Sequence, residues 1–304
     1  MLNINDLIKI FAREIRNRIT EADIDFETIE EIRLRVNCPI IVVSRGNEKI
    51  LNDKFIVEKE HIFETIEYIS NYSLYAFEDE VKQGFITIAG GHRVGIAGQA
   101  VVERGGIKGF KYITFINVRI AHQVVGCGEK LIEYIYSDSG VNNTLIVSPP
   151  GLGKTTLLRD LVRLISDGNR YGKGMTVGIV DERSEIAGCY LGVPQNRIGI
   201  RSDVIDSCSK AEGMMMLIRA MSPKVIAIDE LGGQTDIEAV KAIKNCGCSI
   251  LATAHAGNFD EIRKTKRDVF DMYLVLKPNG SKGIDIEVRD EKSIVSIINW
   301  RDLC

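Results

Sequence analysis

The segment from Ser148 to Thr156 constrains this chain most, because it reads Ser-Pro-Pro-Gly-Leu-Gly-Lys-Thr-Thr. The apolar run 144–147 before it is of strand type, and apolar residues recur at helical spacing after it from Leu157 to Ile165. A strand, a glycine loop and a helix in this order are the context that a phosphate-binding P-loop requires. The segment therefore predicts a site for a nucleoside triphosphate.

The loop is predicted to hold the phosphates with its amides and the N-terminus of the following helix. We expect Lys154 to reach the outer two phosphates and the Thr155 hydroxyl to complete the shell of a Mg²⁺ ion. The pattern asks for glycine at its first position, where this chain has Ser148, and a small residue makes that turn if its φ is negative. The expected nucleotide-binding residues are Pro150, Gly151, Leu152, Gly153, Lys154, Thr155 and Thr156.

A second part of the site is predicted where the apolar run 224–228 ends in Asp229 and Glu230. Such an ending alone is common at the polar end of a strand. After a P-loop, with a β-α-β pattern between them, it indicates catalysis. We expect Asp229 to bind Mg²⁺ through its water shell, and Glu230 to polarise the water that attacks the γ-phosphoryl group.

Two further polar groups follow predicted strands, and ligands of parallel sheets lie beyond the carboxyl ends of the strands. His255 follows the run 250–253, so it either senses the γ-phosphate and polarises the same water or only caps the strand. The segment from Asp181 to Glu185 adds more carboxylates at a strand end. Its chemistry leaves a site loop and a solvated loop both open.

Composition narrows the class of protein. The chain has 304 residues, 27% of them charged and 45% hydrophobic, as in soluble globular proteins of two domains. The net charge of 39 − 42 = −3 disfavours a dedicated nucleic-acid binder. We find no apolar run of about 18 residues and no signal segment at the start, so we expect a cytosolic protein. Seven scattered cysteines fit a reducing compartment.

The residue pattern of the chain changes at the glycine-containing stretch near residue 126. We predict an N-terminal α+β domain over 1–125 and a P-loop domain over 126–304. The first domain is predicted to have helices over 7–15 and 60–70 and strands over 32–36, 39–43, 84–88 and 94–98.

The second domain alternates apolar strands with amphipathic helices, which predicts an α/β fold with a mainly parallel sheet covered on both faces. A helix over 129–136 is expected to lead into the P-loop strand, and the segments 272–276, 284–288 and 294–298 are expected to be edge strands. The other strands are predicted at 144–147, 176–180, 225–228 and 249–253, with helices that begin near Lys154, Ala211 and Asp236.

The order of these motifs resembles that of the secretion and type IV pilus ATPases. Asp181 to Glu185 stands where those enzymes carry an acidic box, and Thr253 to Ala256 where they carry a histidine box. One departure is Asp229 before Glu230, where pilus motors commonly have glycine. The resemblance implies a P-loop NTPase fold of RecA/AAA type and Mg-dependent ATP hydrolysis, for which Glu230, Lys154 and His255 are the catalytic candidates in this domain.

The N-terminal half resembles a sporulation branch of these ATPases more closely, on the segments Glu31–Arg35, Phe77–Gly95 and Ile116–Ile120. This resemblance implies a homo-oligomeric ring, usually a hexamer, in which Arg93 and Arg119 are candidate contacts in trans to the phosphates. Their alternative role is to flank strands and bind surface carboxylates. The family also implies an integral membrane partner, which is met from the cytoplasmic side in the mother cell and faces the forespore.

Three functions stay open at this point. The first is an ATP-hydrolysing motor of a sporulation-associated, secretion-like transport complex at the cell envelope. The second is a ring scaffold that binds ATP with negligible turnover, and it uses the same residues. The third is a nucleic-acid motor ATPase, which the acidic net charge and the lack of a basic, aromatic-rich segment disfavour. No nucleic-acid partner is expected. The lack of an Asn-Lys-x-Asp signature favours ATP over GTP.

Overall fold

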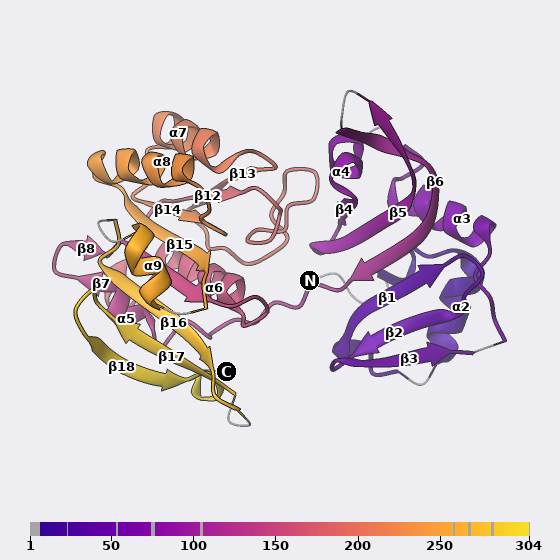
Figure 1. The fold of residues 1–304 in the computed structure, drawn as a ribbon, viewed down its shortest axis with the longest axis horizontal. Helices are drawn as coiled ribbons and strands as arrows, with labels where there is room; N and C mark the ends of the chain where they lie inside the picture. Colours follow the sequence, from indigo (N-terminus) through magenta and orange to yellow (C-terminus); the bar gives the residue numbers. More distant parts are fainter. Residues whose placement is uncertain are drawn as a thin grey trace. The chain divides into compact units, whose positions relative to one another are not determined.

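The computed structural model describes residues 7–22, 24–52, 54–73, 77–103, 106–257, 259–266, 269–280 and 283–303. The chain divides into two compact units, Met1–His122 and Gln123–Cys304 (Figure 1). Among the described residues, no helix combines the length and the apolar character needed to cross a membrane.

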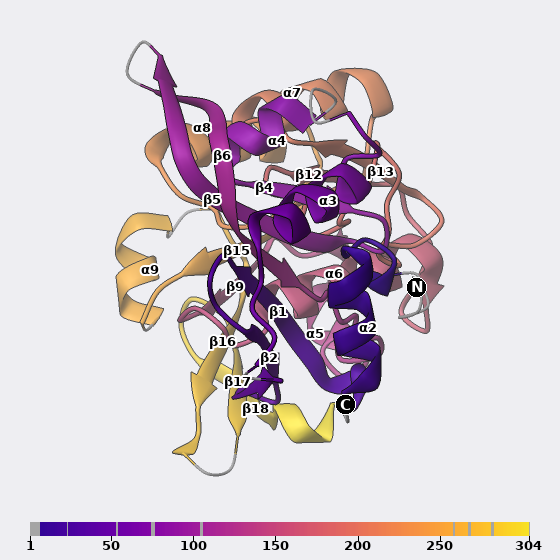
Figure 2. The same cartoon turned by 90° about the vertical axis from the view of Figure 1, so that its right-hand side faces the viewer.

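The first unit is built on a six-stranded antiparallel sheet with the order β3-β2-β1-β6-β5-β4. Alternate residues of its strands face the core, such as Ile32 and Leu34, which are buried. Strands β5 and β6 run as a long twisted hairpin (Figure 2). The elements are α2 (Arg13–Glu21), β1 (Ile29–Arg35), β2 (Ile40–Ser44), β3 (Asn47–Leu51), α3 (Lys59–Ile69), α4 (Glu78–Gln83), β4 (Phe85–Ile88), β5 (His92–Glu103) and β6 (Gly106–Arg119), with a 3₁₀ turn at Phe26–Thr28.

The second unit is built on an eight-stranded sheet with the order β13-β12-β14-β15-β9-β16-β17-β18. The six strands from β13 to β16 are parallel, while β17 and β18 each run antiparallel to the strand before them. The strands are β9 (Thr144–Ser148), β12 (Val177–Asp181), β13 (Ser202–Asp206), β14 (Val225–Ile228), β15 (Ser249–His255), β16 (Met272–Pro278), β17 (Ile284–Arg289) and β18 (Ile294–Asn299). The helices are α5 (Ile132–Ile135), α6 (Lys154–Asp167), α7 (Lys210–Met221), α8 (Gln234–Asn245), α9 (Phe259–Lys266) and the 3₁₀ helix η4 (Trp300–Asp302), and two short hairpins pair β7 (Tyr136–Ser137) with β8 (Gly140–Val141) and β10 (Gly168–Asn169) with β11 (Gly172–Lys173).

Helices cover both faces of this sheet. In β9, Ile146 packs into the cluster with α5 and α6, whereas Leu145 and Val147 pack into the cluster with α7, α8 and α9. Helices α7 and α8 lie together over the sheet (Figure 1). Because both faces are buried, the strands are continuously apolar, and this pattern made them visible in the sequence.

The α/β fold with a parallel P-loop sheet and a smaller α+β unit before it is confirmed. Three local expectations were wrong. The segments 272–276 and 284–288 are not edge strands, because β16 pairs with β9 and β17, and β17 pairs with β16 and β18; of the three, only β18 is an edge strand. The helix expected over 129–136 is only the four-residue α5, since a turn precedes it and β7 begins at Tyr136. Helix α2 begins at Arg13, several residues after the apolar pattern starts, because Ile10 and Phe11 donate to carbonyls three residues back in a separate turn.

One polar group in the core of the first unit has a consequence for stability. His92 begins β5, is 7% exposed, and its Nδ1 accepts a hydrogen bond from the Ala121 amide at 3.0 Å. Burial, assisted by the nearby His122, lowers the pKa of His92 to about 4. The ring is therefore neutral in the folded chain at pH values where an unfolded histidine, with a pKa of about 6.5, already binds a proton.

We predict that His92 lowers the stability of the protein in mild acid. Between pH 6.5 and 4 the unfolded chain binds more protons, so the free energy of unfolding falls as pH falls, by about 2 kcal/mol between pH 7.5 and pH 5. In His92→Asn, whose side-chain oxygen can replace the Nδ1 acceptor, this part of the pH dependence should disappear. Urea unfolding of both proteins at the two pH values measures it, and an equal pH dependence would contradict the assignment.

Candidate nucleotide-binding and catalytic site

The loop after β9 has the backbone of an anion site. Gly151 and Gly153 have φ of +79° and +83°, a region that glycine enters without strain. Gly153 is the N-cap of α6, and within the described part of the chain no side chain caps this helix. Its first amides therefore point at the position of a bound anion. Ser148 closes β9 outside the left-handed region and its hydroxyl donates to the Pro149 carbonyl at 2.7 Å, so serine makes this turn.

The sheet order gathers the predicted residues at one edge. Asp229 follows β14 and His255 ends β15, and β15 lies between β14 and the P-loop strand β9. The Thr155 hydroxyl donates to Asp229 Oδ2 at 2.7 Å, and Thr253 on β15 donates to the other carboxylate oxygen of Asp229. The loop, the acidic pair and the histidine thus form one site.

Lys154, His255 and Glu230 form a hydrogen-bonded chain. His255 Nε2 lies 2.7 Å from Glu230 Oε1, and Lys154 Nζ lies 3.0 Å from His255 Nδ1. Lys154 Nζ also lies 3.2 Å from His255 Nε2. The ammonium group can only donate and the ionised carboxylate can only accept, so a ring with its proton on Nε2 satisfies both partners, by accepting from Lys154 at Nδ1 and donating to Glu230. The imidazole therefore joins the phosphate-binding lysine to the predicted general base.

The backbone at Glu230 is strained. Its φ of +54° lies in the left-handed region, which costs a non-glycine residue roughly 1–2 kcal/mol. Thr253 holds it there, because its hydroxyl accepts from the Glu230 amide at 2.8 Å and its carbonyl accepts from the Leu231 amide at 2.7 Å. Thr253 is a positioning residue that the sequence analysis missed, and its only signal was its place two residues before His255.

Charges in the site shift two pKa values. Burial lowers the pKa of Lys154, which is 5% exposed, and the carboxylates of Asp229, Glu230 and Glu185 oppose this. For Glu230, burial raises the pKa, but the His255 hydrogen bond and the charges of Arg183 and Lys154 outweigh it, and the net pKa is lowered. Glu230 is therefore ionised at neutral pH, with Arg183 Nη1 at 3.0 Å from its second oxygen.

The donor set at the end of α6 suits Mg²⁺. The Thr155 hydroxyl and the Asp229 carboxylate are hard oxygen donors, and Mg²⁺ takes few such ligands and completes its shell with phosphate and water. Among the described residues, no group of three or more His, Cys, Asp or Glu is placed to hold a metal ion.

The acidic segment after β12 is a loop of the site with a buried anchor. The Asp181 carboxylate is 1% exposed and accepts from the amides of Glu185, Ile186 and Ala187. Arg159 on α6 donates to the carbonyls of Glu185 and Ile186. Both carboxylate oxygens of Asp181 therefore accept hydrogen bonds that hold the loop in shape. Arg183, on the same loop, contacts Glu230.

Arg93 and Arg119 lie opposite each other on β5 and β6 of the first unit. The Arg93 guanidinium lies 4.0 Å from the centroid of the Phe85 ring, and Arg119 Nε lies 3.5 Å from Glu31 Oε1. The Glu31 contact matches the alternative role of Arg119 as a partner of a surface carboxylate. Any role in trans stays a proposal.

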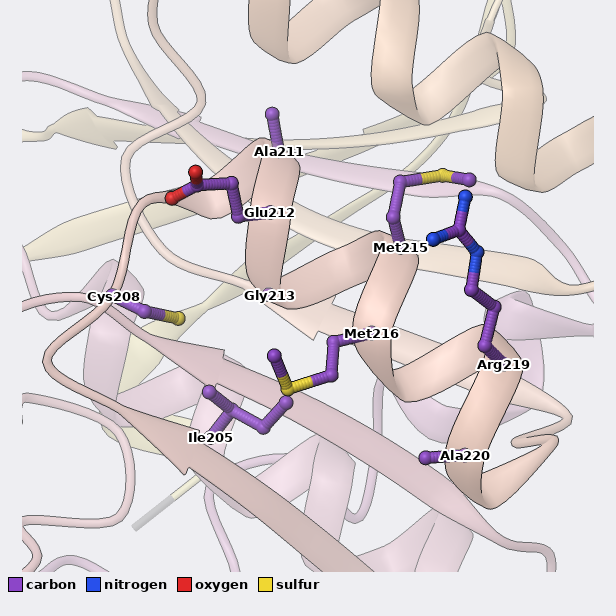
Figure 3. Close-up of a pocket in the computed structure, with 9 residues that line it drawn as sticks. All are labelled: Ile205, Cys208, Ala211, Glu212, Gly213, Met215, Met216, Arg219 and Ala220. Carbon is purple, nitrogen blue, oxygen red and sulfur yellow. The ribbon is translucent and has the colours of Figure 1, made fainter.

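A cavity of about 780 Å³ lies at the other end of the sheet, between β13 and α7. Figure 3 shows Met216 of α7 reaching toward Ile205 of β13, with Met215 beside Arg219. Its lining is mostly apolar and it lies on the far side of β12 from the P-loop, so it is separate from the nucleotide site.

Comparisons with known proteins show what this chain is similar to in sequence and in fold. The family model "Sporulation stage III, protein AA" matches residues 2–296. Stage III sporulation protein AA of Bacillus subtilis (strain 168) is 41% identical over 295 residues, which are 94% of this chain and 95% of that protein. The fold is similar to that of the pilus retraction motor PilT with bound ADP (TM-score 0.63, 15% identity, 96% of this chain and 84% of that one) and of the Legionella pneumophila ATPase DotB (TM-score 0.58, 15% identity, 86% and 76%).

We predict that Asp181 supports the fold more than it supports chemistry. Asp181→Ala removes the acceptor of three amides, of which those of Ile186 and Ala187 are buried. At about 1–3 kcal/mol for each buried unsatisfied group, we expect a loss of about 2–6 kcal/mol in the free energy of unfolding. Glu182→Ala, the neighbouring carboxylate paired with Lys210 near the surface, should cost less than about 1 kcal/mol. Urea unfolding measures both, and equal losses would refute the anchoring role.

Proposed function

We propose, from the premise that this chain belongs to the sporulation stage III protein AA family, that it is a Mg-dependent ATPase that drives a secretion-like complex during sporulation. The observation that carries the proposal is the chain of contacts from Lys154 through His255 to Glu230, beside the Thr155–Asp229 hydrogen bond. These contacts support the proposal because they bring the residues proposed as phosphate ligand, metal ligands and general base together at the N-terminal end of α6.

In the proposed reaction, the α6 amides and Lys154 bind the β- and γ-phosphates. Thr155 and Asp229 would hold Mg²⁺, and when bound the ion would neutralise charge on the phosphate oxygens. Glu230 accepts the proton of the water that attacks the γ-phosphorus in line with the bond to ADP. That bond breaks as the new one forms, and the products are ADP and inorganic phosphate.

The contacts of Glu230 give this reaction a control step. Each carboxylate oxygen of Glu230 already has a partner, His255 on one side and Arg183 on the other. A bound γ-phosphate competes with His255 for the ammonium group of Lys154. When Lys154 leaves His255, the imidazole and the Glu230 carboxylate are free to turn toward the attacking water. Nucleotide binding would thereby put Glu230 in position to act as the general base.

The second unit offers a surface for another copy of the chain. Strand β13 ends the sheet with one unpaired edge, and edges of this kind are normally covered. Beside it, Met216 and Met221 on α7 are 58% and 53% exposed, which is unusual for large apolar side chains on one helix. We propose that these residues form part of the contact between subunits of a hexameric ring, with Arg93 and Arg119 of a neighbouring subunit serving as contacts to the phosphates.

The remaining parts of the proposal follow from family membership. A ring of this family acts on an integral membrane partner from the cytoplasmic side, in the mother cell. A scaffold that binds ATP without turnover would use the same side chains, and the first experiment below separates it from a motor. We expect no stimulation by single-stranded DNA.

We predict that two substitutions separate binding from turnover. Lys154→Ala should abolish binding of Mg·ATP, because it removes the cation between the outer phosphates. Glu230→Gln should keep binding but lower the rate of phosphate release at least about 100-fold, the usual effect of losing a general base. Isothermal titration and a phosphate-release assay, with and without the membrane partner, measure the two quantities.

Glu182→Gln makes the same change at a carboxylate of the acidic loop after β12, which is paired with Lys210, and as the matched control it should keep the parental rate. Glu230→Gln protein that hydrolyses ATP at the parental rate would disprove the role of Glu230. Binding without turnover in the parent protein, with the partner present, would select the scaffold.

We predict that charge on α7 disrupts the ring. Met216→Glu places a carboxylate in the proposed contact and should shift the protein in sedimentation velocity from the oligomer to the monomer when ATP is present. Ile50→Glu puts the same charge on an exposed apolar position of β3 in the first unit and should leave the oligomer intact. An oligomer that survives Met216→Glu would exclude this face.

A further inference from the structure

The end of the sheet brings the chain's single tryptophan to the P-loop. Strand β18 runs antiparallel to β17, which runs antiparallel to β16, so β18 has the same direction as β9. Its carboxyl end therefore lies at the same edge of the sheet as the P-loop, and Trp300 begins the 3₁₀ helix η4 directly after it. Trp300 is the only tryptophan among the 304 residues.

The indole lies against the phosphate loop itself. A Cβ atom built on Gly153 would meet Cη2, Cζ2 and Cζ3 of Trp300 at 3.3, 3.4 and 3.9 Å. The six-membered ring of the indole thus contacts the backbone at the N-cap of α6, and the absence of a side chain at Gly153 makes room for it. Position 153 needs glycine both for its positive φ and for this contact.

The position of Trp300 is fixed by hydrogen bonds of its neighbours. Asn299 accepts from the Arg301 amide at 3.0 Å and donates to Asp285 at 2.8 Å. The same carboxylate accepts from Asn279 at 2.5 Å, which joins the end of β16 to the end of β18. The turn that carries the indole is therefore tied to two strands of the sheet before any ligand arrives.

The indole is only partly buried. It packs against the margin of the hydrophobic cluster that contains the apolar side chains of α6. Within the described part of the chain, the structure records no hydrogen bond from its ring N–H. A partly buried aromatic ring beside a phosphate loop can offer a face to a flat ligand, and a core tryptophan would be expected to use its N–H.

The direction of the bound nucleotide follows from the sheet order. Glu230 and His255 mark the γ-phosphate end, and they come from β14 and β15 on one side of β9. Trp300 comes from the other side of β9, beyond β16 and β17. A triphosphate laid across the N-terminus of α6 with its γ-phosphate toward Glu230 directs its α-phosphate, ribose and base toward Trp300.

We propose that Trp300 is the stacking platform for the base of the nucleotide, an inference that rests on the proposed function. Every nucleobase has a π-face, so the indole distinguishes a nucleotide from a bare polyphosphate and does not choose between adenine and guanine. Loss of one stacked aromatic ring lowers affinity by about tenfold to hundredfold.

The first test compares ligands with and without a base on the full chain. Mg·ATP, Mg·GTP and Mg·tripolyphosphate are titrated calorimetrically into the parent protein, Trp300→Phe and Trp300→Ala. We expect Trp300→Ala to weaken binding of both nucleotides about tenfold to hundredfold and to leave tripolyphosphate binding within about twofold. Trp300→Phe, which keeps a stacking face, should restore most of the nucleotide affinity. A tryptophan that only supports the loop would lower the affinity for all three ligands alike.

The second test uses tryptophan emission of the parent protein, which comes from Trp300 alone. ATP and GTP should quench it, while tripolyphosphate at saturation should leave most of the emission unchanged. Equal quenching by tripolyphosphate, or an unchanged ratio of ATP to tripolyphosphate affinity in Trp300→Ala, overturns this inference and leaves the proposed ATPase intact. A parent protein that binds none of the three ligands refutes the proposed function and this inference together.

Discussion

The hydrogen bond between Thr155 and Asp229 is the contact on which the site depends. It joins the first turn of α6 to the end of β14 across the intervening strand β15, and it requires the register of three parallel strands to be correct. Thr253 on β15 supports the same carboxylate from between them. A slip of either strand by one residue would turn its side chains to the opposite face and separate the metal ligands. The continuously apolar strands, buried on both faces, are what fix this register.

Much of the fold was predictable because its signals are local. The P-loop after β9 and the apolar runs of β12, β14 and β15 are each read from fewer than about ten residues, and parallel strands are continuously apolar by necessity. The element most clearly misjudged, β16, shows the limit. It pairs with β9 on one side and β17 on the other, and β17 in turn pairs with β18, so only β18 is an edge strand at this end of the sheet. Strand order is a property of the whole sheet, and no segment carries it alone.

The candidate site was predictable in its residue types and not in its contacts. Lys154, Asp229, Glu230 and His255 were found from motif order, and the structure brings them together. The left-handed backbone of Glu230 was not predictable, because glutamate has no preference for it. It exists because Thr253, on another strand, binds the Glu230 amide. Strain of this kind is set by tertiary contacts and is invisible to local patterns. Asp181 shows the opposite case. In the sequence it could belong to the site, but in the structure it is buried and its carboxylate anchors the loop through backbone amides.

The two ends of the proposed nucleotide are controlled by opposite halves of the same sheet. In the proposed reaction, β14 and β15 supply the groups that act on the γ-phosphate, and the contacts of these groups would break and form as the phosphate arrives and leaves. The strands β16 to β18 supply Trp300, on a turn that Asp285 ties to two strand ends. If the base end of the nucleotide is held rigidly at Trp300, the contacts around the γ-phosphate can rearrange without release of the ligand. This division would suit the proposed motor, because the chain of contacts at Glu230 could switch at every turnover while the proposed stacking on Trp300 holds the nucleotide in place.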